Sequence, residues 1–477
     1  YMVRRPVDAE RGIDPDSDLF SPGYFTAFLE GGQTAELYAD IVETQKEKRL
    51  PIKAASNNPD ILFDDGDSWK LNEAMKMALD QYVVKRKNLK TVIAGYPWFL
   101  DWGRDALIFA RGLIAAGNTR DAGDILHQFG QFEEGGTLPN MIRGTSAENR
   151  DTSDASLWYF VACSDLINAE KKEAFLDAQC DGRTIREILL SIGRSMISGT
   201  FNGIVMDQKS GLIFSPAHFT WMDTNHPAGT PREGYPIEIQ ALWYFALYFL
   251  AHIDNERKGG EWEKVAGQVR SSIYKLYWME EEGYLSDCLH ACSGKPARQA
   301  DRDDALRPNQ LLAVTLGAVT DKTIIRKIVA ACEELLVPGA IRSLADRPVC
   351  YPIKIVDNGD VINDPYNPYH GKYTGDEDTN RKPAYHNGAA WTWLFPVFCE
   401  AWVKAYGDQG RDAALAWLGS SARLISQGCA GHVPEILDGD FPHAQRGCDA
   451  QAWGASELLR VWEAYNCITK KQSEAIP

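Results

Sequence analysis

The chain has 477 residues, and its 50 Lys and Arg against 66 Asp and Glu give a formal net charge of −16. Proteins that bind nucleic acid or anionic membranes gather basic residues, so this balance argues against both classes. Intrinsic disorder is also excluded, because 44% of the residues are hydrophobic and 11% are aromatic. Aromatic rings stack on the C–H faces of sugars, and carboxylates accept bonds from hydroxyls. A neutral carbohydrate ligand therefore suits this composition best.

The first 65 residues differ from the rest of the chain. Clusters of Asp, Asn, Pro and Gly, as at residues 14–18 and 64–67, predict an irregular segment or the remnant of another domain over 1–65. We see no signal peptide, and the longest apolar run, residues 241–251, is too short to span a membrane. The ten Cys follow no regular spacing, which favours reduced thiols in a cytoplasmic protein.

Helical patterns dominate the remaining residues, 66–477. Apolar residues recur every three to four positions in about twelve segments, and few stretches alternate as strands do. Some segments come as pairs joined by short turns: 105–116 with 120–132, and 311–319 with 321–336. Thr184 and Glu187 form a predicted capping box before another segment. This pattern predicts an all-α domain of helical hairpins arranged in a ring.

Four long connections interrupt the helices, at residues 200–236, 280–308, 337–385 and 428–449. Long loops inside a compact domain are uncommon and usually functional. These loops contain much of the Trp, Tyr, His and Asp. We therefore expect them to gather on one face of the ring and to form the active site there.

The densest group of polar and aromatic residues runs from Tyr96 to Asp105, where a helix is predicted to begin. One interpretation is a sugar-binding site in which Trp102 stacks on a ring while Arg104 and Asp105 bind its hydroxyls. The alternative is that Asp105 is only a helix cap and Arg104 its ion-pair partner.

Two further carboxyls stand in apolar surroundings. Asp223 follows Trp221 in a long loop, where an apolar environment would raise the pKa of the carboxyl, as a general acid requires. A simple loop turn is the equally weighted alternative. Glu435 lies between apolar neighbours in the last long loop, which is unusual for a solvated surface residue.

Other clusters of polar residues stand at predicted helix starts beside the long loops. They occur at residues 154–158, 231–238, 307–310 and 385–391. Capping explains any one of them, but together they indicate that one end of the helices lines a pocket. A metal site is not expected: Cys288, His290 and Cys292 lack a second pair of zinc ligands, and the start of a calcium loop at residues 14–18 lacks its glycine. No phosphate-binding or dinucleotide-binding motif occurs, so no cofactor is expected.

Several motifs, in the same order along the chain, resemble those of glycogen debranching enzymes. They lie at residues 91–99, 102–105, 220–223, 236–244, 385–388, 434–435 and 450–453. The similarity is to the amylo-α-1,6-glucosidase domain of that family and extends over residues 85–466. Two differences stand out: Ala106 occupies a position where Thr is expected, and the first 80 residues do not match. The chain has no room for the glucanotransferase domain of the eukaryotic enzymes, so no transferase activity is expected.

The resemblance implies an (α/α)6 barrel, or six-hairpin toroid, and an inverting glycoside hydrolase that releases glucose from α-1,6 branch points. Its substrate would be glycogen, limit dextrin or a branched malto-oligosaccharide. Asp223 would be the general acid and Glu435 the general base. The implied substrate-binding residues are Trp102, Arg104, Asp105, Asp154, Trp158, Trp221, Arg232, Glu238, Asn309, His386 and Trp453.

Two other functions remain open from the sequence. A glucoamylase or α-glucosidase would share the barrel and the carboxyl pair but cleave α-1,4 linkages. A non-catalytic glucan-binding module would share the aromatic residues, although the presence of both carboxyls disfavours it.

Overall fold

The computed structural model describes residues 2–4, 16–18, 26–36, 68–144, 146–224, 230–254, 260–357 and 359–473. The chain divides into two units, Tyr1–Asn58 and Pro59–Pro477. In the first unit, strand β1 (Met2–Arg4) pairs antiparallel with β2 (Asp16–Asp18). Most of the segment predicted as irregular, residues 1–65, lies outside the described residues, and so does Asp14 of the calcium-like pattern.

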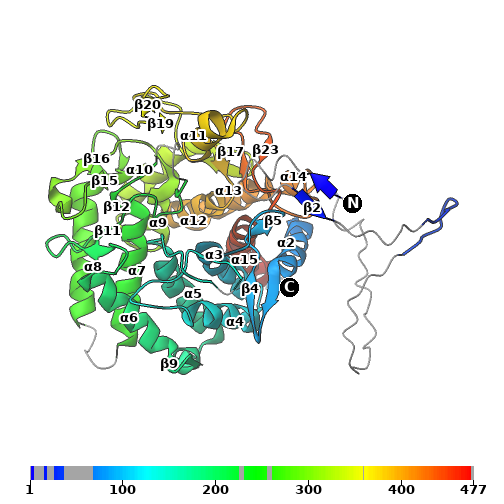
Figure 1. The fold of residues 1–477 in the computed structure, drawn as a ribbon, viewed down its shortest axis with the longest axis horizontal. Coiled ribbons are helices and arrows are strands. Elements are labelled where there is room, and N and C mark those ends of the chain that lie inside the picture. The colour runs from blue at the N-terminus through cyan, green and yellow to red at the C-terminus, as the bar shows by residue number, and fades with distance from the viewer. Residues whose placement is uncertain are drawn as a thin grey trace. The chain divides into compact units, whose positions relative to one another are not determined.

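Helices make up most of the second unit (Figure 1). Six of the described helices, called the inner helices here, are α3 (Gly103–Ala115), α5 (Ala155–Glu170), α7 (Ile237–Ile253), α9 (Leu311–Thr315), α12 (Leu394–Tyr406) and α15 (Ala452–Ser473). Six outer helices alternate with them along the chain: α2 (Ser68–Tyr82), α4 (Thr119–Gly130), α6 (Ile185–Ser198), α8 (Gly260–Ser272), α10 (Lys322–Cys332) and α13 (Asp408–Gly419). The short helices α11 (Lys382–Tyr385) and α14 (Ala422–Ile425) lie in loops.

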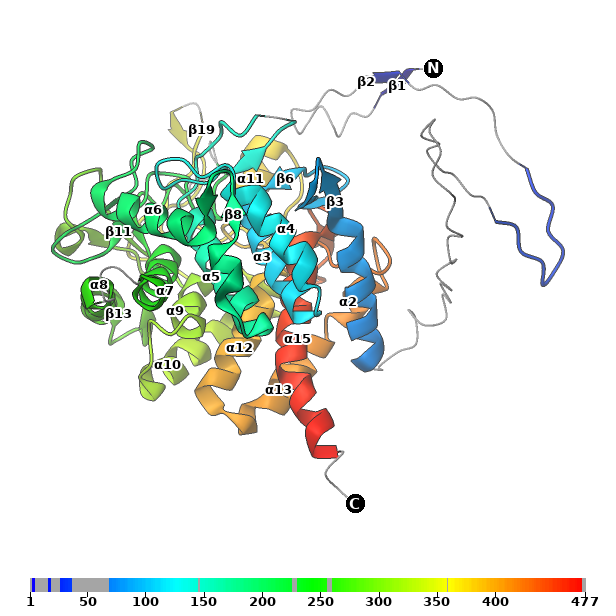
Figure 2. The ribbon, with the colours of Figure 1, turned by 90° about the horizontal axis from the view of Figure 1, so that it is seen from below.

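The inner helices pack against one another in succession. Helix α3 contacts α5, α5 contacts α7, α7 contacts α9, α9 contacts α12, α12 contacts α15, and α15 returns to α3. The outer helices pack on this series: α2 on α15, α4 on α3, α6 and α8 on α7, α10 and α13 on α12 (Figures 1 and 2). The contact between α15 and α3 brings the last long helix of the chain against one of the first.

Composition explains which helices lie inside. A helix buried on all sides is apolar all round, and α3 is buried from Gly103 to Ile114. The outer helices carry buried residues mainly on one face, and three of them, α4, α6 and α10, begin with the polar caps Asn118, Thr184 and Asp321. The predicted capping box is confirmed: the side chain of Thr184 accepts from the backbone N–H of Glu187, and the Glu187 side chain accepts from that of Thr184.

The predicted helix pairs occur with small shifts of their ends. The pair 105–116 and 120–132 corresponds to α3 and α4. The segment predicted over 311–319 is helical only to Thr315, because Gly317 adopts a φ of +80° and ends it. Helix α10 stops at Cys332 and continues as a 3₁₀ turn over Glu333–Leu335.

Short strands, most of two residues, connect the loops, and few of them were expected from alternating patterns in the sequence. A five-stranded antiparallel sheet contains, in spatial order, β17 (Leu336–Val337), β18 (Ala340–Arg342), β21 (Ala390–Trp391), β22 (Ile436–Leu437) and β23 (Gln445–Arg446). A three-stranded sheet contains β12 (Gly234–Pro236), β15 (Cys288–His290) and β16 (Asp301–Arg302). The two-stranded pairs are β3 (Val83–Arg86) with β4 (Leu89–Val92), β5 (Gly95–Tyr96) with β24 (Ala450–Gln451), β6 (Asp101–Trp102) with β7 (Met141–Ile142), β8 (Gln179–Cys180) with β9 (Arg183–Thr184), β10 (Val205–Met206) with β11 (Ile213–Phe214), β13 (Trp278–Met279) with β14 (Tyr284–Leu285), and β19 (Val356–Asp357) with β20 (Asp360–Val361).

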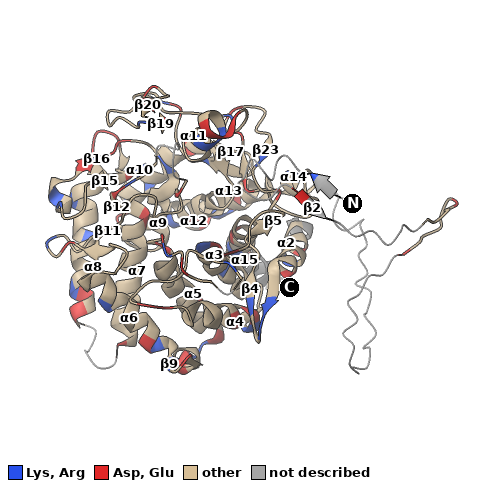
Figure 3. Cartoon of the chain, in the orientation of Figure 1, with Lys and Arg blue, Asp and Glu red and all other residues tan. Residues whose placement is uncertain are grey.

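Acidic and basic residues are interspersed over the helices and loops of the described chain and do not gather on one element (Figure 3). The net charge therefore does not point to a particular binding face. None of the helices among the described residues is both long and apolar enough to cross a membrane. Nine Cys are described, all of them free and six of them buried.

The close packing of α3 against α15 gives a test of the fold. A Cβ at Gly112 in α3 would lie 2.7 Å from the Cα and carbonyl oxygen of Ser456 in α15, so Gly112→Ala forces the two helices apart. We expect this change to lower the free energy of unfolding by about 1–3 kcal/mol. The measurement is the midpoint of thermal unfolding, followed by circular dichroism.

Gly123→Ala in the neighbouring helix α4 is the matched control. A Cβ there would meet only ordinary contacts, at 3.7 Å from Phe175 and 3.9 Å from Leu166. Because Ala is the better helix former, this change should raise stability by about 0.5–1 kcal/mol. Equal effects of the two changes would contradict the packing described here.

Candidate active site

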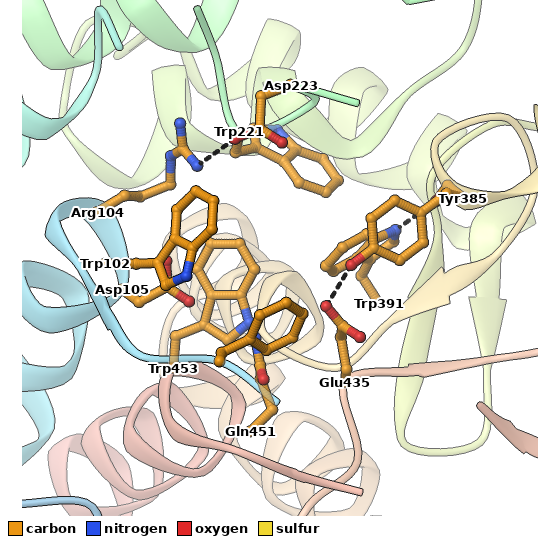
Figure 4. A pocket seen from close by; sticks show the side chains of 11 residues that line it. Trp102, Arg104, Asp105, Trp221, Asp223, Tyr385, Trp391, Glu435, Gln451 and Trp453 are labelled. Atoms are coloured by element: carbon orange, nitrogen blue, oxygen red, sulfur yellow. Dashed lines mark hydrogen bonds and ion pairs between the residues drawn. The ribbon is translucent and has the colours of Figure 1, made fainter. Parts of the chain in front are cut away.

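A pocket opens where the inner helices begin (Figure 4). Trp102, Arg104 and Asp105 come from the start of α3, and Trp453 comes from the start of α15. The long loops supply the other side chains. The pocket is lined by Phe99, Trp102, Arg104, Asp105, Trp221, Asp223, Tyr385, Trp391, Glu435, Gln451 and Trp453. The positive ends of the helix dipoles of α3 and α15 thus lie next to a group of carboxyls, which they stabilise.

Asp223 lines this pocket, and 28% of its side chain is exposed. Its Oδ2 lies 3.2 Å from Nη1 of Arg104. Burial of the carboxyl raises the pKa of Asp223, and the charge of Asp154 adds to this, whereas the charge and bond of Arg104 lower it. The net pKa lies above the ordinary value, which favours the protonated form that a general acid needs.

Arg104 is held in place by two further bonds. Its Nε donates to Oδ2 of Asp154 at 2.6 Å, and its Nη2 donates to the carbonyl oxygen of Thr220 at 3.0 Å. The guanidinium group therefore links the start of α3, the start of α5 and the loop that carries Asp223. Arg104 is both a wall of the pocket and the residue that fixes where Asp223 points (Figure 4).

Glu435 lies on the other side of the pocket and is 3% exposed (Figure 4). The hydroxyl of Tyr385 donates to its Oε1, and the backbone N–H of Cys448 donates to its Oε2 at 2.8 Å. Both bonds favour the ionised carboxylate and hold it in one orientation. A Cβ at Gly447 would come within 2.3 Å of Oε2, so only glycine leaves room for the carboxylate there.

Asp105 is a third carboxyl near the other two. Its burial, together with the negative charges of Asp223 and Glu435, raises its pKa to about 8, although Arg104 acts in the opposite direction. At neutral pH the group is therefore mostly protonated in the empty pocket. In that form it can donate a hydrogen bond to a sugar oxygen as well as accept one.

Aromatic rings form the rest of the pocket wall. Trp221 makes edge-to-face contacts with Trp391, at 5.0 Å between ring centroids, and with Trp393 at 5.4 Å. Trp393 stacks on Trp453 at 4.7 Å. The indole N–H of Trp221 donates to Oδ1 of Asn309 at 2.7 Å. These contacts fix the rings so that their free faces and edges can receive a ligand without rearrangement.

The structure brings seven of the residues expected from the sequence into the pocket lining: Trp102, Arg104, Asp105, Trp221, Asp223, Glu435 and Trp453. Six others lie behind the lining: Asp154, Trp158, Arg232, Glu238, Asn309 and His386. Asp154 bonds Arg104, Trp158 packs on Trp393, and His386 stacks on Trp391 at 5.3 Å. Asp154 and His386 thus contact side chains that line the pocket, whereas Trp158 contacts Trp393, which in turn stacks on the lining residue Trp453.

Arg232 and Glu238 belong to a buried charge cluster beneath Trp221. Arg232 makes a two-bond ion pair with Glu238, and its Nε donates to Oδ2 of Asp287 at 2.7 Å. The other oxygen of Asp287 accepts from Nδ2 of Asn309, the residue that holds Trp221. Each charge has a partner, as burial at this depth requires.

Four lining residues were missed as candidates: Phe99, Tyr385, Trp391 and Gln451. All four lie inside motifs that the sequence analysis pointed out. The motifs were therefore visible in the sequence, but these four residues were not assigned to the binding site. Tyr385 is separated from Glu435 by 50 residues, and no spacing rule reveals a bond between them. Asp287, which joins Arg232 to Asn309, was missed for the same reason.

No group of three His, Cys, Asp or Glu side chains among the described residues is placed to hold a metal ion. In the Cys288–Cys292 segment, Cys288 is buried and contacts the carbonyl oxygen of Arg232, while Cys292 is exposed. His290 binds Asp303 at 3.0 Å.

Solved glycosidase structures share this fold. A glycosidase in complex with glucose aligns with a TM-score of 0.56 at 13% identity, covering 85% of this chain and 99% of that one. A bacterial glucoamylase complexed with acarbose aligns with a TM-score of 0.52 at 14% identity, covering 83% of this chain and 55% of that one. A mannosylglycerate hydrolase from Thermus thermophilus aligns with a TM-score of 0.54 at 12% identity, covering 82% of this chain and 99% of that one.

Fold, paired carboxyls and aromatic pocket together identify the class of this protein as a glycoside hydrolase. The family model described as amylo-alpha-1,6-glucosidase matches residues 77–460, and the chain belongs to that family. The glycogen debranching enzyme of Saccharomyces cerevisiae is 24% identical over 499 aligned positions, which cover 80% of this chain. The chain spans 31% of the length of that relative.

The raised pKa of Asp105 predicts a specific pH dependence of stability. Between an ordinary pKa of 3.8 and the folded-state pKa of about 8, the folded chain keeps a proton that the unfolded chain loses. The contribution of Asp105 to the free energy of unfolding is therefore largest below pH 4 and decreases as the pH rises toward 8. Asp105→Asn cannot ionise, so its thermal midpoint should rise relative to the wild type from pH 5 to 8 and then level off.

Asp412→Asn, which removes a charge from a side chain that is 86% exposed, is the control for a change in net charge. The two thermal midpoints are measured at half-unit pH steps. A constant difference between Asp105→Asn and the wild type over this range would contradict the burial of an ionisable Asp105.

Proposed function

We propose that this chain is an inverting amylo-α-1,6-glucosidase that removes single glucosyl units at α-1,6 branch points of glycogen or limit dextrin. We propose further that its inner and outer helices form an (α/α)6 barrel with the active site at one end. The observation that carries the proposal is the pair of carboxyls, Asp223 and Glu435, on opposite sides of an aromatic pocket (Figure 4). Membership of the family supports the linkage, and the order of helix packing supports the barrel.

The two carboxyls have environments suited to different roles. Asp223 has a raised pKa, so it retains a proton that it can donate to the glycosidic oxygen as the bond to C1 breaks. Glu435 accepts two hydrogen bonds, which favour its ionised form. In this form it takes a proton from a water molecule whose oxygen bonds C1 from the opposite face. The water supplies one proton to Glu435 and its hydroxyl to the sugar, so atoms and charge balance.

Inversion requires space for that water. In inverting enzymes the two carboxyl groups are about 6.5–9.5 Å apart, whereas retaining enzymes hold them at about 5–5.5 Å. The location of Asp223 and Glu435 on opposite sides of the pocket is consistent with the wider arrangement. The transition state carries positive charge on the sugar, and the ionised carboxylate of Glu435 together with the carbonyl dipole of the protonated Asp105 carboxyl stabilises that charge.

The aromatic residues would select a sugar ring without charge. Trp102 and Trp453 offer apolar surface, while Arg104 and protonated Asp105 offer hydrogen bonds to hydroxyls. The wall is formed on one side by Trp221, whose ring is fixed by Asn309. A rigid wall of this kind favours a terminal unit over an internal unit of a glucan chain.

The decisive experiment is glucose release from a phosphorylase limit dextrin whose branches carry single glucosyl stubs, followed by ¹H NMR of the first product. We expect β-glucose first, since inversion converts an α-linkage into a β-anomer. Asp223→Asn and Glu435→Gln should each lower kcat by about 10²–10⁴ with the fold intact by circular dichroism. Asp165→Asn, which alters a partly exposed ion pair with Arg111 away from the pocket, is the matched control.

Other results would replace parts of the proposal. α-Glucose as the first product rules out inversion, and near-wild-type turnover in either carboxyl variant rules out its assigned role. Faster hydrolysis of maltose than of isomaltose and the branched dextrin would establish the glucoamylase-like alternative. Family membership already argues against the non-catalytic glucan-binding module, because the matched family is one of enzymes.

Tyr385 is expected to act as a positioning residue for Glu435. Tyr385→Phe removes the hydroxyl that donates to Oε1, and a hydrogen bond to a charged group contributes about 1.5–3 kcal/mol. We therefore expect kcat to fall about 10–100-fold with little change in KM. The acid limb of the pH–rate profile should move to higher pH, because the ionised carboxylate loses a donor.

Tyr369→Phe is the control for this prediction. The Tyr369 hydroxyl donates to Asp440 at 2.9 Å, and neither residue lines the pocket. An unchanged pH–rate profile in Tyr385→Phe would mean that the bond to Glu435 does not favour the base form.

A further inference from the structure

A second polar cavity lies outside the pocket that holds the carboxyl pair. Its volume is about 310 Å³, within the range of small-molecule sites. Three separate loop segments form it, together with the end of β15. The lining residues are Thr230, Pro231, Arg232, His290, Asp303, Arg307, Tyr351, Pro352, Ile353 and Lys354.

The two cavities have no lining residue in common. The buried charge cluster of Arg232, Asp287 and Asn309 stands between them: Arg232 lines the second cavity, and Asn309 holds Trp221 in the wall of the first. The second cavity is therefore a separate place for a ligand and not an extension of the catalytic pocket.

One hydroxyl in the second cavity lacks a partner. Thr230 is 2% exposed, and its Oγ1 makes no hydrogen bond to any of the described residues. A buried polar atom without a partner costs about 1–3 kcal/mol, and native structures keep few of them. A ligand hydroxyl in the cavity would satisfy Thr230 as both donor and acceptor.

The other polar groups of the cavity are arranged in advance. His290 binds Asp303 through its Nε2 at 3.0 Å, and its ring stacks on Tyr351 at 4.3 Å between centroids. Burial, with smaller effects of Asp303 and Cys288, raises the pKa of Tyr351 to about 12. Its phenol therefore remains a hydrogen-bond donor at neutral pH. Tyr351 lines the cavity, so its ring can offer apolar surface to a ligand such as the C–H face of a sugar.

Charges around this cavity balance. Arg232 and Arg307 are buried, but carboxylates compensate them: Glu238 and Asp287 pair with Arg232, and Asp287 lies 3.6 Å from Arg307. Counting the exposed Lys354 and the buried Asp303 with these, three basic side chains face three acidic ones. Such a site gives an anion little net attraction and favours a neutral ligand with many hydroxyls.

We propose that this cavity is a second carbohydrate-binding site, which holds a neutral glucosyl unit of a malto-oligosaccharide or glucan chain through Thr230, Tyr351 and the His290–Asp303 pair. It binds without cleaving, because the described lining holds one carboxyl, Asp303, and that carboxyl is bonded to His290. Its position beside the catalytic pocket would keep a large glucan near the site where branches are cut.

Amide hydrogen exchange of the 477-residue chain tests the proposal, with maltotriose as the probe and Glu435→Gln as the protein, so that no substrate is consumed. Residues 349–354 report on the second cavity, since the amides of Tyr351 and Ile353 bond to Asp304 and to the carbonyl oxygen of Pro365. Residues 433–437 report on the catalytic pocket. At ten times the dissociation constant, exchange in 349–354 should slow by about 10-fold.

Thr230→Val and Tyr351→Leu, tested separately, should abolish the slowing in 349–354 and leave that in 433–437 unchanged. Slowing that persists in both variants overturns the proposal, and so does the absence of slowing in 349–354 of the parent protein. Inorganic phosphate is the contrasting probe, and slowing by phosphate but not by maltotriose also overturns it. Slowing in 349–354 without slowing in 433–437 would support the second site while counting against the proposed catalytic pocket.

Discussion

The burial of the inner helices over most of their length is the constraint on which the rest of the structure depends. A helix that is covered on most sides can bury a polar side chain only with a partner, so α3 and α7 are largely apolar, and Arg111 in the middle of α3 is paired with Glu457 of α15. Other polar side chains stand at the helix ends, where unpaired backbone N–H groups and loops provide partners. The candidate active-site pocket lies at such ends because there the core can accommodate carboxyls.

Burial also explains how the chain arranges its charges. Arg104 and Arg232 are each nearly inaccessible, and each is held by carboxylates on other segments. Ion pairs in such places contribute little net stability but are costly to break, so they fix geometry. Arg104 thereby connects two helix starts with the loop of Asp223. The geometry of the site is set before a ligand arrives, which is the condition for electrostatic catalysis.

Much of this could be predicted from the sequence, for reasons that follow from local patterns. Helical periodicity located most helices, and the capping box at Thr184 marked one start to the residue. The motifs containing Trp102, Asp223 and Glu435 located the pocket, since each places a polar group among aromatic residues at a helix start or in a long loop. These are properties of neighbouring residues, and a sequence displays them directly.

Contacts between distant segments could not be predicted in this way. The bond from Tyr385 to Glu435, the pairing of Asp287 with Arg232, and the two-residue strands of the loops depend on which segments meet in three dimensions. The same holds for the placement of Arg232, which the sequence suggested as a sugar ligand and which the structure locates behind the pocket wall. A strand of two residues has too little length to show alternation.

The meeting of α3 with α15 has a consequence for biosynthesis. The pairing of β5 with β24 joins residues about 355 positions apart, and two residues that line the pocket lie in or just after β24: Gln451 belongs to the strand, and Trp453 follows it. When the ribosome has made the inner and outer helices up to α13, helix α15 is still missing. The pocket of this nascent chain therefore lacks one wall, and the apolar helix α3 is not yet covered by α15. Until translation reaches the last helix, that exposed surface is a natural target for chaperones, and no hydrolysis can begin.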